Sequence, residues 1–326
     1  MSQNYLFVHF KEKLTPDGEQ VYFGLSQDGY HWEAVNSGRP ILYSMLGEKG
    51  VRDFTVVRGV NGKFYIIATD LCLSYEMIPK YQDKWSNVKR FGSHDLMLWE
   101  SDDLCHFKPQ RALHLGPDDG GCLWAPDVMF DEATGEYILH WSAPKMNQDT
   151  SQYPDGMKMC IWYARTKDFE SFSQPAILYE KEDAGIIDSC MNKEDGKYYL
   201  FVKSEKNPCG VILLTSDQIT GPFVRMTQFD DEMNRLEGGA EVYEAPCIYK
   251  LEDGGYCLNL DFFGVKGKGQ GYVPFKASSM ASGVFTRADG DFSFPYGFKH
   301  GTILPISEEE YDRIKAFDYE GEMYRK

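Results

Sequence analysis

Short apolar runs separated by polar turns recur along the whole chain of 326 residues. The runs are rich in Val, Ile, Tyr, Phe and Trp, and Gly, Asp and Asn fill the gaps between them. This pattern is typical of β-strands joined by tight turns, because a helix needs apolar residues at intervals of three and four positions. Helical spacing is clear only after Ser307, where we expect a short surface helix over about residues 307–316. The sequence therefore predicts an all-β protein.

One unit recurs: a strand that opens with a polar residue, a turn containing Gly, and a second strand rich in Tyr and aliphatic residues. Its copies open at Asp53, Asp127, Asp188, Glu244 and His300, with spacings of 74, 61, 56 and 56 residues. Repeats of this length with several short strands each predict the blades of a β-propeller. A Ser-or-Thr, Asp, aromatic turn motif follows in several copies, at residues 26–32, 101–107 and 166–172.

The two ends of the chain complement each other. The N-terminal segment contains strand-like runs at residues 5–10 and 21–25 but no opening strand, whereas the segment from His300 contains an opening strand and no successors. Pairing of the two segments in one blade would close the ring and leave no open seam. We therefore expect one five-bladed β-propeller domain over residues 1–326.

Composition narrows the function. The chain is 42% hydrophobic and 26% charged, as in ordinary globular proteins, and its formal net charge of -16 disfavours binding to nucleic acid. No apolar stretch is long enough for a membrane helix, and no secretion signal is recognisable at the N-terminus. The eight Cys residues lack metal-ligand spacing, so we interpret them as reduced thiols of a cytoplasmic protein.

The blade openings carry the candidate chemistry. The innermost strands of a propeller line its axis, so Asp53, Asp127, Asp188, Glu244 and His300 are expected to converge there. Each carboxylate alone could simply cap a turn, but four of them around one axis are costly unless they serve a function. Glycoside hydrolysis needs such a set, since one carboxylic acid protonates the leaving oxygen while another carboxylate activates water or attacks the sugar.

These strands resemble those of glycoside hydrolase family 43, which includes inverting β-xylosidases, α-L-arabinofuranosidases, arabinanases and galactanases. The resemblance covers nearly the whole chain and implies that Asp53 is the general base, Glu244 the general acid, and Asp188 the residue that raises the pKa of the acid. The motifs that carry it are Asp53 before a Gly-containing turn, Trp124-Ala125-Pro126-Asp127, Ile187-Asp188-Ser189, Tyr243-Glu244-Ala245-Pro246 and the late His300.

Further site residues are expected around this set. Phe54, Trp124 and Asp127 are candidates for substrate binding, with Phe54 standing where the family usually has Pro. The resemblance places His300 near an axial calcium ion or water cluster, and no cofactor is required for the reaction. Two polar insertions, residues 74–94 and 145–157, are expected to shape the mouth of the pocket.

The leading hypothesis is an exo-acting, inverting hydrolase that removes arabinofuranosyl, xylosyl or galactosyl units from plant-polysaccharide oligosaccharides. An inverting mechanism predicts a base-to-acid separation of about 6.5–9.5 Å. Two alternatives stay open. A glycoside phosphorylase would need a phosphate site, for which the Gly- and Lys-rich loop 264–271 is a candidate, although its composition also suits a plain rim loop. A non-catalytic propeller that binds glycans is the other.

Overall fold

Antiparallel β-sheets dominate the computed structural model, which describes residues 3–11, 15, 17–116, 120–236, 239–263, 271–295 and 297–323. The described strands form five sheets of four strands each, which confirms the predicted all-β fold. From the innermost strand outward, four of the sheets are β4 (Val51–Arg58), β5 (Phe64–Asp70), β6 (Asp95–Ser101), β7 (Arg111–His114); β8 (Trp124–Asp131), β9 (Glu136–Lys145), β10 (Lys158–Thr166), β11 (Ala176–Tyr179); β12 (Ile186–Glu194), β13 (Lys197–Ser204), β14 (Gly210–Ser216), β15 (Val224–Arg225); and β16 (Tyr243–Lys250), β17 (Tyr256–Phe262), β18 (Gly271–Ala277), β19 (Thr286–Arg287).

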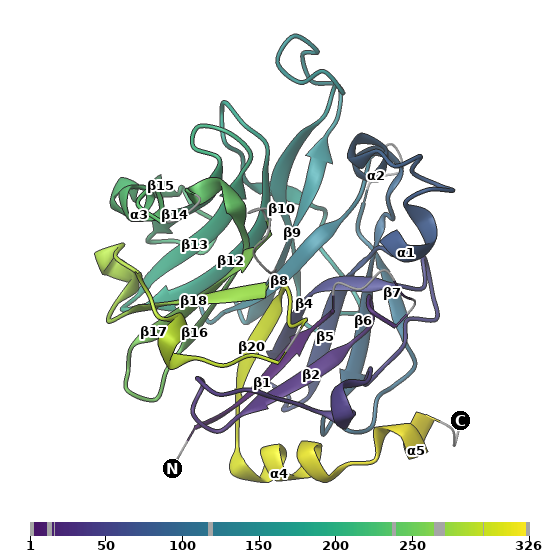
Figure 1. Ribbon diagram of the computed structural model, residues 1–326. Coiled ribbons are helices and arrows are strands. Elements are labelled where there is room, and N and C mark those ends of the chain that lie inside the picture. Colours follow the sequence, from purple (N-terminus) through teal and green to yellow (C-terminus); the bar gives the residue numbers. More distant parts are fainter. Residues whose placement is uncertain are drawn as a thin grey trace.

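The fifth sheet joins the two ends of the chain. It has the order β20 (Gly301–Ile306), β1 (Asn4–His9), β2 (Tyr22–Ser26), β3 (Glu33–Ala34). The innermost strands β4, β8, β12, β16 and β20 gather in the middle of the molecule in Figure 1, and each contacts the next around the ring, with β20 returning to β4. The structure is therefore the predicted five-bladed propeller, closed by pairing of the N- and C-terminal segments.

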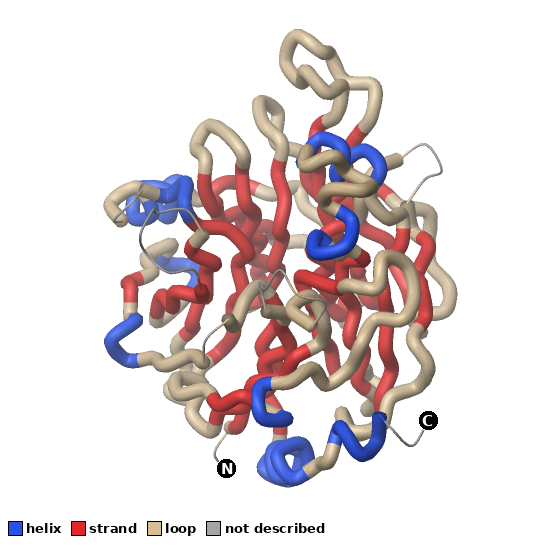
Figure 2. Tube along the Cα trace, turned by 45° about the vertical axis from the view of Figure 1, so that its right-hand side comes forward, coloured by secondary structure: helices blue, strands red, loops and turns tan. Residues whose placement is uncertain are grey.

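Helices lie outside the ring of strands, as Figure 2 shows. Helix α4 begins with the capping box of Ser307 and Glu310, in which each side chain accepts a hydrogen bond from the other residue's backbone N–H. This helix confirms the one expected over residues 307–316. The α- and 3₁₀-helices are α1 (Leu73–Glu76), α2 (Trp85–Phe91), α3 (Thr227–Met233), α4 (Glu308–Ala316), α5 (Tyr319–Met323), η1 (Asn36–Gly38), η2 (Ala240–Val242), η3 (Met280–Ser282) and η4 (Asp289–Asp291).

Each interface between neighbouring blades has its own hydrophobic cluster. The cluster between the fifth sheet and the β4 sheet contains Phe23, Phe54 and Trp99, and Tyr311 of α4 covers it from outside. Four further clusters fill the remaining interfaces, so aromatic side chains from facing sheets interlock all around the ring. This packing explains the high aromatic content and gives the innermost strands a rigid frame.

A β-bulge interrupts the innermost strand of four blades at the same place. In each blade two residues of this strand lie opposite one position of the second strand, and the first of the two has a positive φ. A bulge redirects side chains, and here it turns the opening residues toward one end of the axis. The bulged pairs are Asp53–Phe54 (φ 52° at Asp53), Ala125–Pro126 (48° at Ala125), Asp188–Ser189 (52° at Asp188) and Ala245–Pro246 (53° at Ala245).

The bulges correct the predicted register of the repeat. Asp53 and Asp188 occupy the same blade position, but the residue matching them in the β8 blade is Ala125, and Asp127 lies two positions later. Glu244 lies one position before the bulge, where Trp124 stands in its own blade. The carboxylates therefore come from three different blade positions, and the expectation that all five opening residues match was wrong.

The Ser-or-Thr, Asp motif forms the turn that was expected of it. In the first copy, the hydroxyl of Ser26 accepts a hydrogen bond from the Gly29 amide at 2.9 Å, and the Asp28 carboxylate accepts from two later backbone amides. The copies at Ser101 and Thr166 make the same bonds. These turns stabilise the outer parts of three blades and lie away from the axis.

Two further observations bear on composition. No helix within the described ranges is long and apolar enough to cross a membrane. All eight cysteines have free thiols, and six of them are buried.

The loop 264–271, proposed above as a phosphate-binding candidate, lies outside the described residues except for Gly271.

Candidate active site

A cavity of about 460 Å³ opens at the end of the axis where the bulges lie. Asp53, Asp188, Glu244 and His300, which come from four different blades, all line it. The structure thus brings together the three carboxylates predicted to act in catalysis. The remaining lining residues are Phe10, Arg52, Leu71, Trp85, Lys89, Trp124, Ile187, Glu205, Ala245, Asp261, Phe263 and Lys299.

On one side of the cavity, Asp53 pairs with a cation. The Nδ1 atom of His300 lies 3.1 Å from Oδ1 of Asp53, and both side chains are largely buried. Burial by itself raises the pKa of Asp53, but the hydrogen bond and charge of His300, the charge of Arg52 and a hydrogen bond from Thr69 outweigh it and hold this pKa below its usual value. Asp53 is therefore ionised at neutral pH.

His300 responds in the opposite direction. Burial lowers the pKa of His300, but the hydrogen bond and charge of Asp53, with the charges of Asp188 and Asp261, raise it to about 9. The imidazole is therefore protonated at neutral pH and donates its Nδ1–H to Asp53. The pair is an ion pair that keeps one carboxylate of the cavity charged.

On the other side, Asp188 and Glu244 lie together, and the nearby cations do not outweigh the effect of burial on either carboxyl group. Asp188 is 8% exposed and accepts a hydrogen bond from the backbone N–H of Ala245, next to Glu244 in the chain. Burial raises the pKa of Glu244, the charges of Asp188 and Asp261 raise it further, and the resulting value is about 8 despite Lys299 and Lys203 nearby. Burial also raises the pKa of Asp188. Glu244 is therefore a protonated acid at neutral pH.

A buried ion pair lies next to Glu244. Asp261 on β17 is the cross-strand partner of Glu244, and its Oδ2 lies 2.8 Å from Nζ of Lys299. Both side chains are 5% exposed or less, so this pair is held in fixed geometry by the surrounding protein. The lysine partly offsets the negative charge that Asp261 places beside Glu244.

Hydroxyl groups on the second strands hold the bulges in place. The Asp188 amide donates to Oγ of Ser142 at 2.9 Å, and the Ala125 amide donates to Oγ1 of Thr69 at 2.8 Å. In both cases the hydroxyl belongs to the preceding blade. The strained backbone beside the cavity is thus stabilised by hydrogen bonds between blades.

Two tryptophans form one wall of the cavity. Trp124 on β8 is 8% exposed, and the ring of Trp85 on α2 meets it edge-on at a centroid distance of 6.1 Å. Trp85 is 51% exposed, so about half of this residue is open to solvent. The predicted place of Trp124 at the pocket is confirmed; its binding of substrate stays a prediction.

Two predicted substrate-binding residues lie elsewhere. Phe54 is 1% exposed and packs in the hydrophobic cluster under the β4 sheet, because the bulge turns it away from the cavity, so the prediction that it binds sugar was wrong. Asp127 does not line the cavity either. Its carboxylate accepts hydrogen bonds from Oγ1 of Thr55 at 3.2 Å and from the Met191 amide at 2.8 Å, and His140 lies 3.4 Å away. Asp127 therefore joins three blades around the axis and is a correction to the predicted site.

The calcium ion or water cluster expected near His300 stays a prediction. The Nδ1 atom of His300 is engaged with Asp53 at 3.1 Å. Among the described residues no group of three or more His, Cys, Asp or Glu side chains is arranged to hold a metal ion.

Several lining residues were missed in the sequence. Arg52 lines the cavity together with Asp53 because the bulge follows it in the strand, and its guanidinium lies over the ring of Phe10 at 4.6 Å. Asp261 and Lys299 lie on or beside strands that carry no obvious motif. The sequence did contain a signal for the register. If Ala125-Pro126 is aligned with Ala245-Pro246, Trp124 takes the same position in its blade as Glu244 does in its own, as in the structure. The insertion 74–94 does supply Trp85 and Lys89, as expected of a segment at the pocket mouth.

The chain is similar to known proteins both in sequence and in fold. The chain is 25% identical over 288 residues to an α-L-arabinofuranosidase of Bifidobacterium longum, and the match covers 77% of this chain and 26% of that protein, so the chain spans about a quarter of its length. Among solved structures, a xylan β-1,4-xylosidase of Bacillus halodurans matches with a TM-score of 0.61 at 16% identity, over 94% of this chain and 56% of that one. An endo-1,4-β-xylanase of Bacteroides thetaiotaomicron matches with a TM-score of 0.59 at 16% identity, over 92% and 93% of the two chains.

The structural matches share the fold of this chain. The family model described as a probable glycosyl hydrolase domain, related to glycoside hydrolase family 43, matches residues 1–312. The match includes every blade and every ionisable group of the cavity named above. The chain therefore belongs to this family of probable glycosyl hydrolases related to family 43.

Proposed function

We propose that the protein is an inverting, exo-acting glycoside hydrolase in which Asp53 is the general base and Glu244 the general acid. One observation carries this proposal: a single cavity holds a carboxylate kept ionised by His300 and a carboxyl group kept protonated by burial and by Asp188. Two carboxyl groups with pKa values driven apart are what acid–base glycoside hydrolysis requires.

In the proposed reaction, Asp53 takes a proton from a water molecule as the water oxygen attacks the anomeric carbon. Glu244 donates its proton to the glycosidic oxygen as the bond between this oxygen and the anomeric carbon breaks. Asp188 acts on Glu244 rather than on the substrate, because its negative charge and its hydrogen bond from the Ala245 amide hold the acid protonated and in place. The enzyme returns to its starting state when Asp53 releases its proton to solvent and Glu244 takes one up.

For the substrate we propose arabinofuranosyl or xylosyl units at the ends of plant-polysaccharide oligosaccharides. The sequence relative is named an α-L-arabinofuranosidase, and structural matches include a xylan β-1,4-xylosidase and an exo-β-1,3-galactanase. The half-exposed Trp85 at the cavity suits stacking against a sugar.

The test is a panel of 4-nitrophenyl glycosides with arabinofuranosyl, xylosyl and galactosyl groups, each assayed with and without inorganic phosphate. We expect release of nitrophenol without phosphate, and ¹H NMR should show first the sugar anomer opposite to that of the substrate. Turnover that requires phosphate would indicate a phosphorylase. Absence of turnover with every glycoside, both with and without phosphate, would contradict an enzymatic role and favour the glycan-binding alternative.

A further inference from the structure

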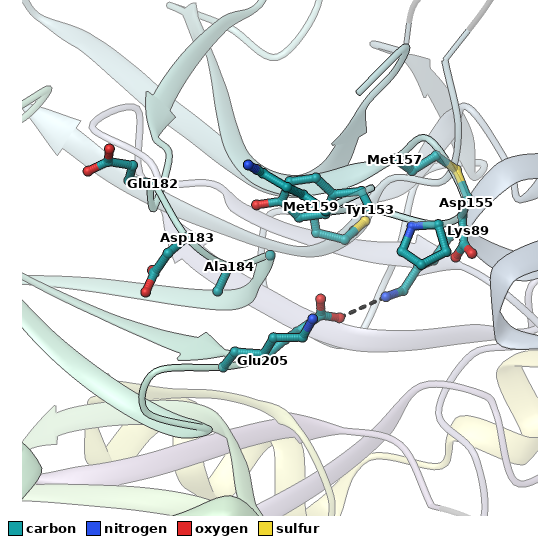
Figure 3. A pocket seen from close by; sticks show the side chains of 13 residues that line it. Lys89, Tyr153, Asp155, Met157, Met159, Glu182, Asp183, Ala184 and Glu205 are labelled. Atoms are coloured by element: carbon teal, nitrogen blue, oxygen red, sulfur yellow. Dashed lines mark hydrogen bonds and ion pairs between the residues drawn. The ribbon is translucent and has the colours of Figure 1, made fainter. Parts of the chain in front are cut away.

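A second cavity of about 480 Å³ adjoins the catalytic one. Lys89 and Glu205 line both cavities, so they form the partition between them. Nζ of Lys89 lies 2.7 Å from Oε1 of Glu205, and Figure 3 shows this ion pair with Tyr153 and Met159 beside it. The remaining lining comes from the insertion after β9, from Met159 on β10, and from the connections that precede β12 and follow β13.

The partition is built into the backbone on both sides. Lys89 lies in the last turn of α2, and its carbonyl accepts a hydrogen bond from the Cys122 amide at 2.9 Å. The Glu205 amide donates to the carbonyl of Gly185 at 2.9 Å, and a Cβ atom at position 185 would overlap the Glu205 carboxylate. The ion pair is therefore positioned by the fold, although its side chains are 22% and 35% exposed and the pair adds little to stability.

The lining of the second cavity suits an uncharged sugar. Carboxylates outnumber ammonium groups there, because Asp155, Glu182, Asp183 and Glu205 line the cavity with Lys89 and Lys206. Lys181, outside the lining, pairs with Asp183, and the balance of these groups remains negative. This balance repels phosphates and uronates, whereas sugar hydroxyl groups can donate hydrogen bonds to carboxylates.

Apolar side chains complete this lining. Met157 and Met159 are buried and form an apolar floor, and Tyr153 is half-buried beside them. In Figure 3 Glu182 and Asp183 lie on one side of the cavity, and Asp155 and Met157 on the other. The cavity thus combines an apolar surface with hydrogen-bond acceptors, as carbohydrate sites do.

We propose that this cavity binds a neutral sugar unit on the leaving side of the scissile bond, with the Lys89–Glu205 pair marking the boundary between the two units. The inference rests on the proposed function and deepens it, because it makes an oligosaccharide the preferred substrate over an aryl glycoside. Its location depends on the insertion 145–157, a segment expected from the sequence only to shape the pocket mouth.

The test compares two substrates with the same terminal sugar: the 4-nitrophenyl glycoside that the native protein cleaves, and the matching trisaccharide. In Tyr153→Ala and Glu205→Gln, we expect the ratio of kcat/KM for the trisaccharide to that for the aryl glycoside to fall about tenfold, since one contact to a sugar hydroxyl or ring is lost. Tyr43→Ala is the control, because Tyr43 is exposed and lines neither cavity. An unchanged ratio in both variants would overturn the proposal.

A binding measurement distinguishes failure of this inference from failure of the proposed function. Isothermal titration of Glu244→Gln and of the double variant Glu244→Gln/Tyr153→Ala with the trisaccharide measures binding with little cleavage. We expect weaker binding by the double variant, about tenfold in Kd. Equal affinities, or no binding by Glu244→Gln, would overturn the inference. If binding weakens as expected but no substrate is cleaved, the proposed hydrolysis fails while the sugar site stands.

Discussion

The two sides of the catalytic cavity treat buried carboxyl groups in opposite ways. Asp53 and Glu244 are both partly buried in the cavity, yet the pKa of Asp53 is lowered and that of Glu244 is raised to about 8. The difference lies in the neighbours: Asp53 pairs with protonated His300, whereas Glu244 faces Asp188 and Asp261. Burial alone therefore does not assign acid and base; the sign of the adjacent charge does.

The largest expected effect comes from replacing either of the two carboxyl groups, Asp53 or Glu244. Asp53→Asn and Glu244→Gln should each lower kcat by about 10²–10⁴-fold, as expected for loss of a general base or acid. The two variants should differ in their dependence on the leaving group. Glu244→Gln should retain more activity on a 2,4-dinitrophenyl glycoside than on a 4-nitrophenyl glycoside, because the better leaving group needs less protonation.

A matched control for these variants is Asp127→Asn. Asp127 also opens a blade, but its carboxylate binds Thr55 and the Met191 amide and does not line the cavity. We expect this change to lower the melting temperature and to leave the leaving-group dependence as in the native protein. Equal losses of kcat in all three variants would contradict the assignment of Asp53 and Glu244.

The acid side can be tested through its pH dependence. If Glu244 is the general acid, as proposed, activity should fall as pH rises through the raised pKa of this residue, about 8. Asp188→Asn removes a negative charge beside Glu244 and should move this alkaline limb to lower pH by about one unit. The measurement is the pH profile of kcat/KM. An alkaline limb that stays in place would show that Asp188 does not act on Glu244.

The base side should respond at the other end of the profile. If Asp53 is the general base, as proposed, the acidic limb of the profile should report the lowered pKa of this residue. His300→Gln removes the cation that lowers it, and the acidic limb should move to higher pH. The control is His114→Gln, because His114 lies 2.8 Å from Asp95 in a similar His–Asp pair whose side chains are 61% and 30% exposed. A shift of equal size in both variants would contradict a specific role for His300.

The sequence foretold the arrangement of blades better than the details of the site. Periodic strands, Gly-containing turns and complementary chain ends are local or repeated signals, and the five blades and their closure followed from them. The convergence of Asp53, Asp188 and Glu244 also followed, since innermost strands meet at the axis. The family resemblance supplied roles that spacing alone could not.

The errors have one physical origin. A bulge adds one residue to a strand and so changes which side chains face the axis, and its place depends on hydrogen bonds to neighbouring blades. Phe54 and Asp127 were therefore assigned to the pocket although the bulges turn them elsewhere. Arg52 was missed because the same bulge brings it to the cavity beside Asp53. Glu205 and Lys299 were missed because they reach the cavity through contacts between distant segments, which no local pattern records.

The contrast between the two sides also predicts a smaller effect, on stability. The folded-state pKa of Glu244 lies above the ordinary value of 4.5, so between about pH 4.5 and pH 8 the unfolded chain binds fewer protons at this position than the folded protein. The contribution of Glu244 to the free energy of unfolding must then decrease with pH in this range. Glu244→Gln removes this titration and should raise the melting temperature relative to the native protein, by more at about pH 7.5 than at about pH 5.

Asp53→Asn should show the opposite sign under the same conditions. The folded-state pKa of Asp53 is lowered, so its ion pair with His300 stabilises the protein above the ordinary pKa of the carboxyl group, and this contribution disappears as pH falls below it. Replacement of Asp53 should therefore lower the melting temperature at neutral pH, and by less in acid. Differential scanning calorimetry of both variants across pH measures the sign of these two changes in melting temperature. If both variants shift the melting temperature in the same direction at neutral pH, the two sides of the cavity do not differ electrostatically, and the assignment of acid and base loses its physical basis.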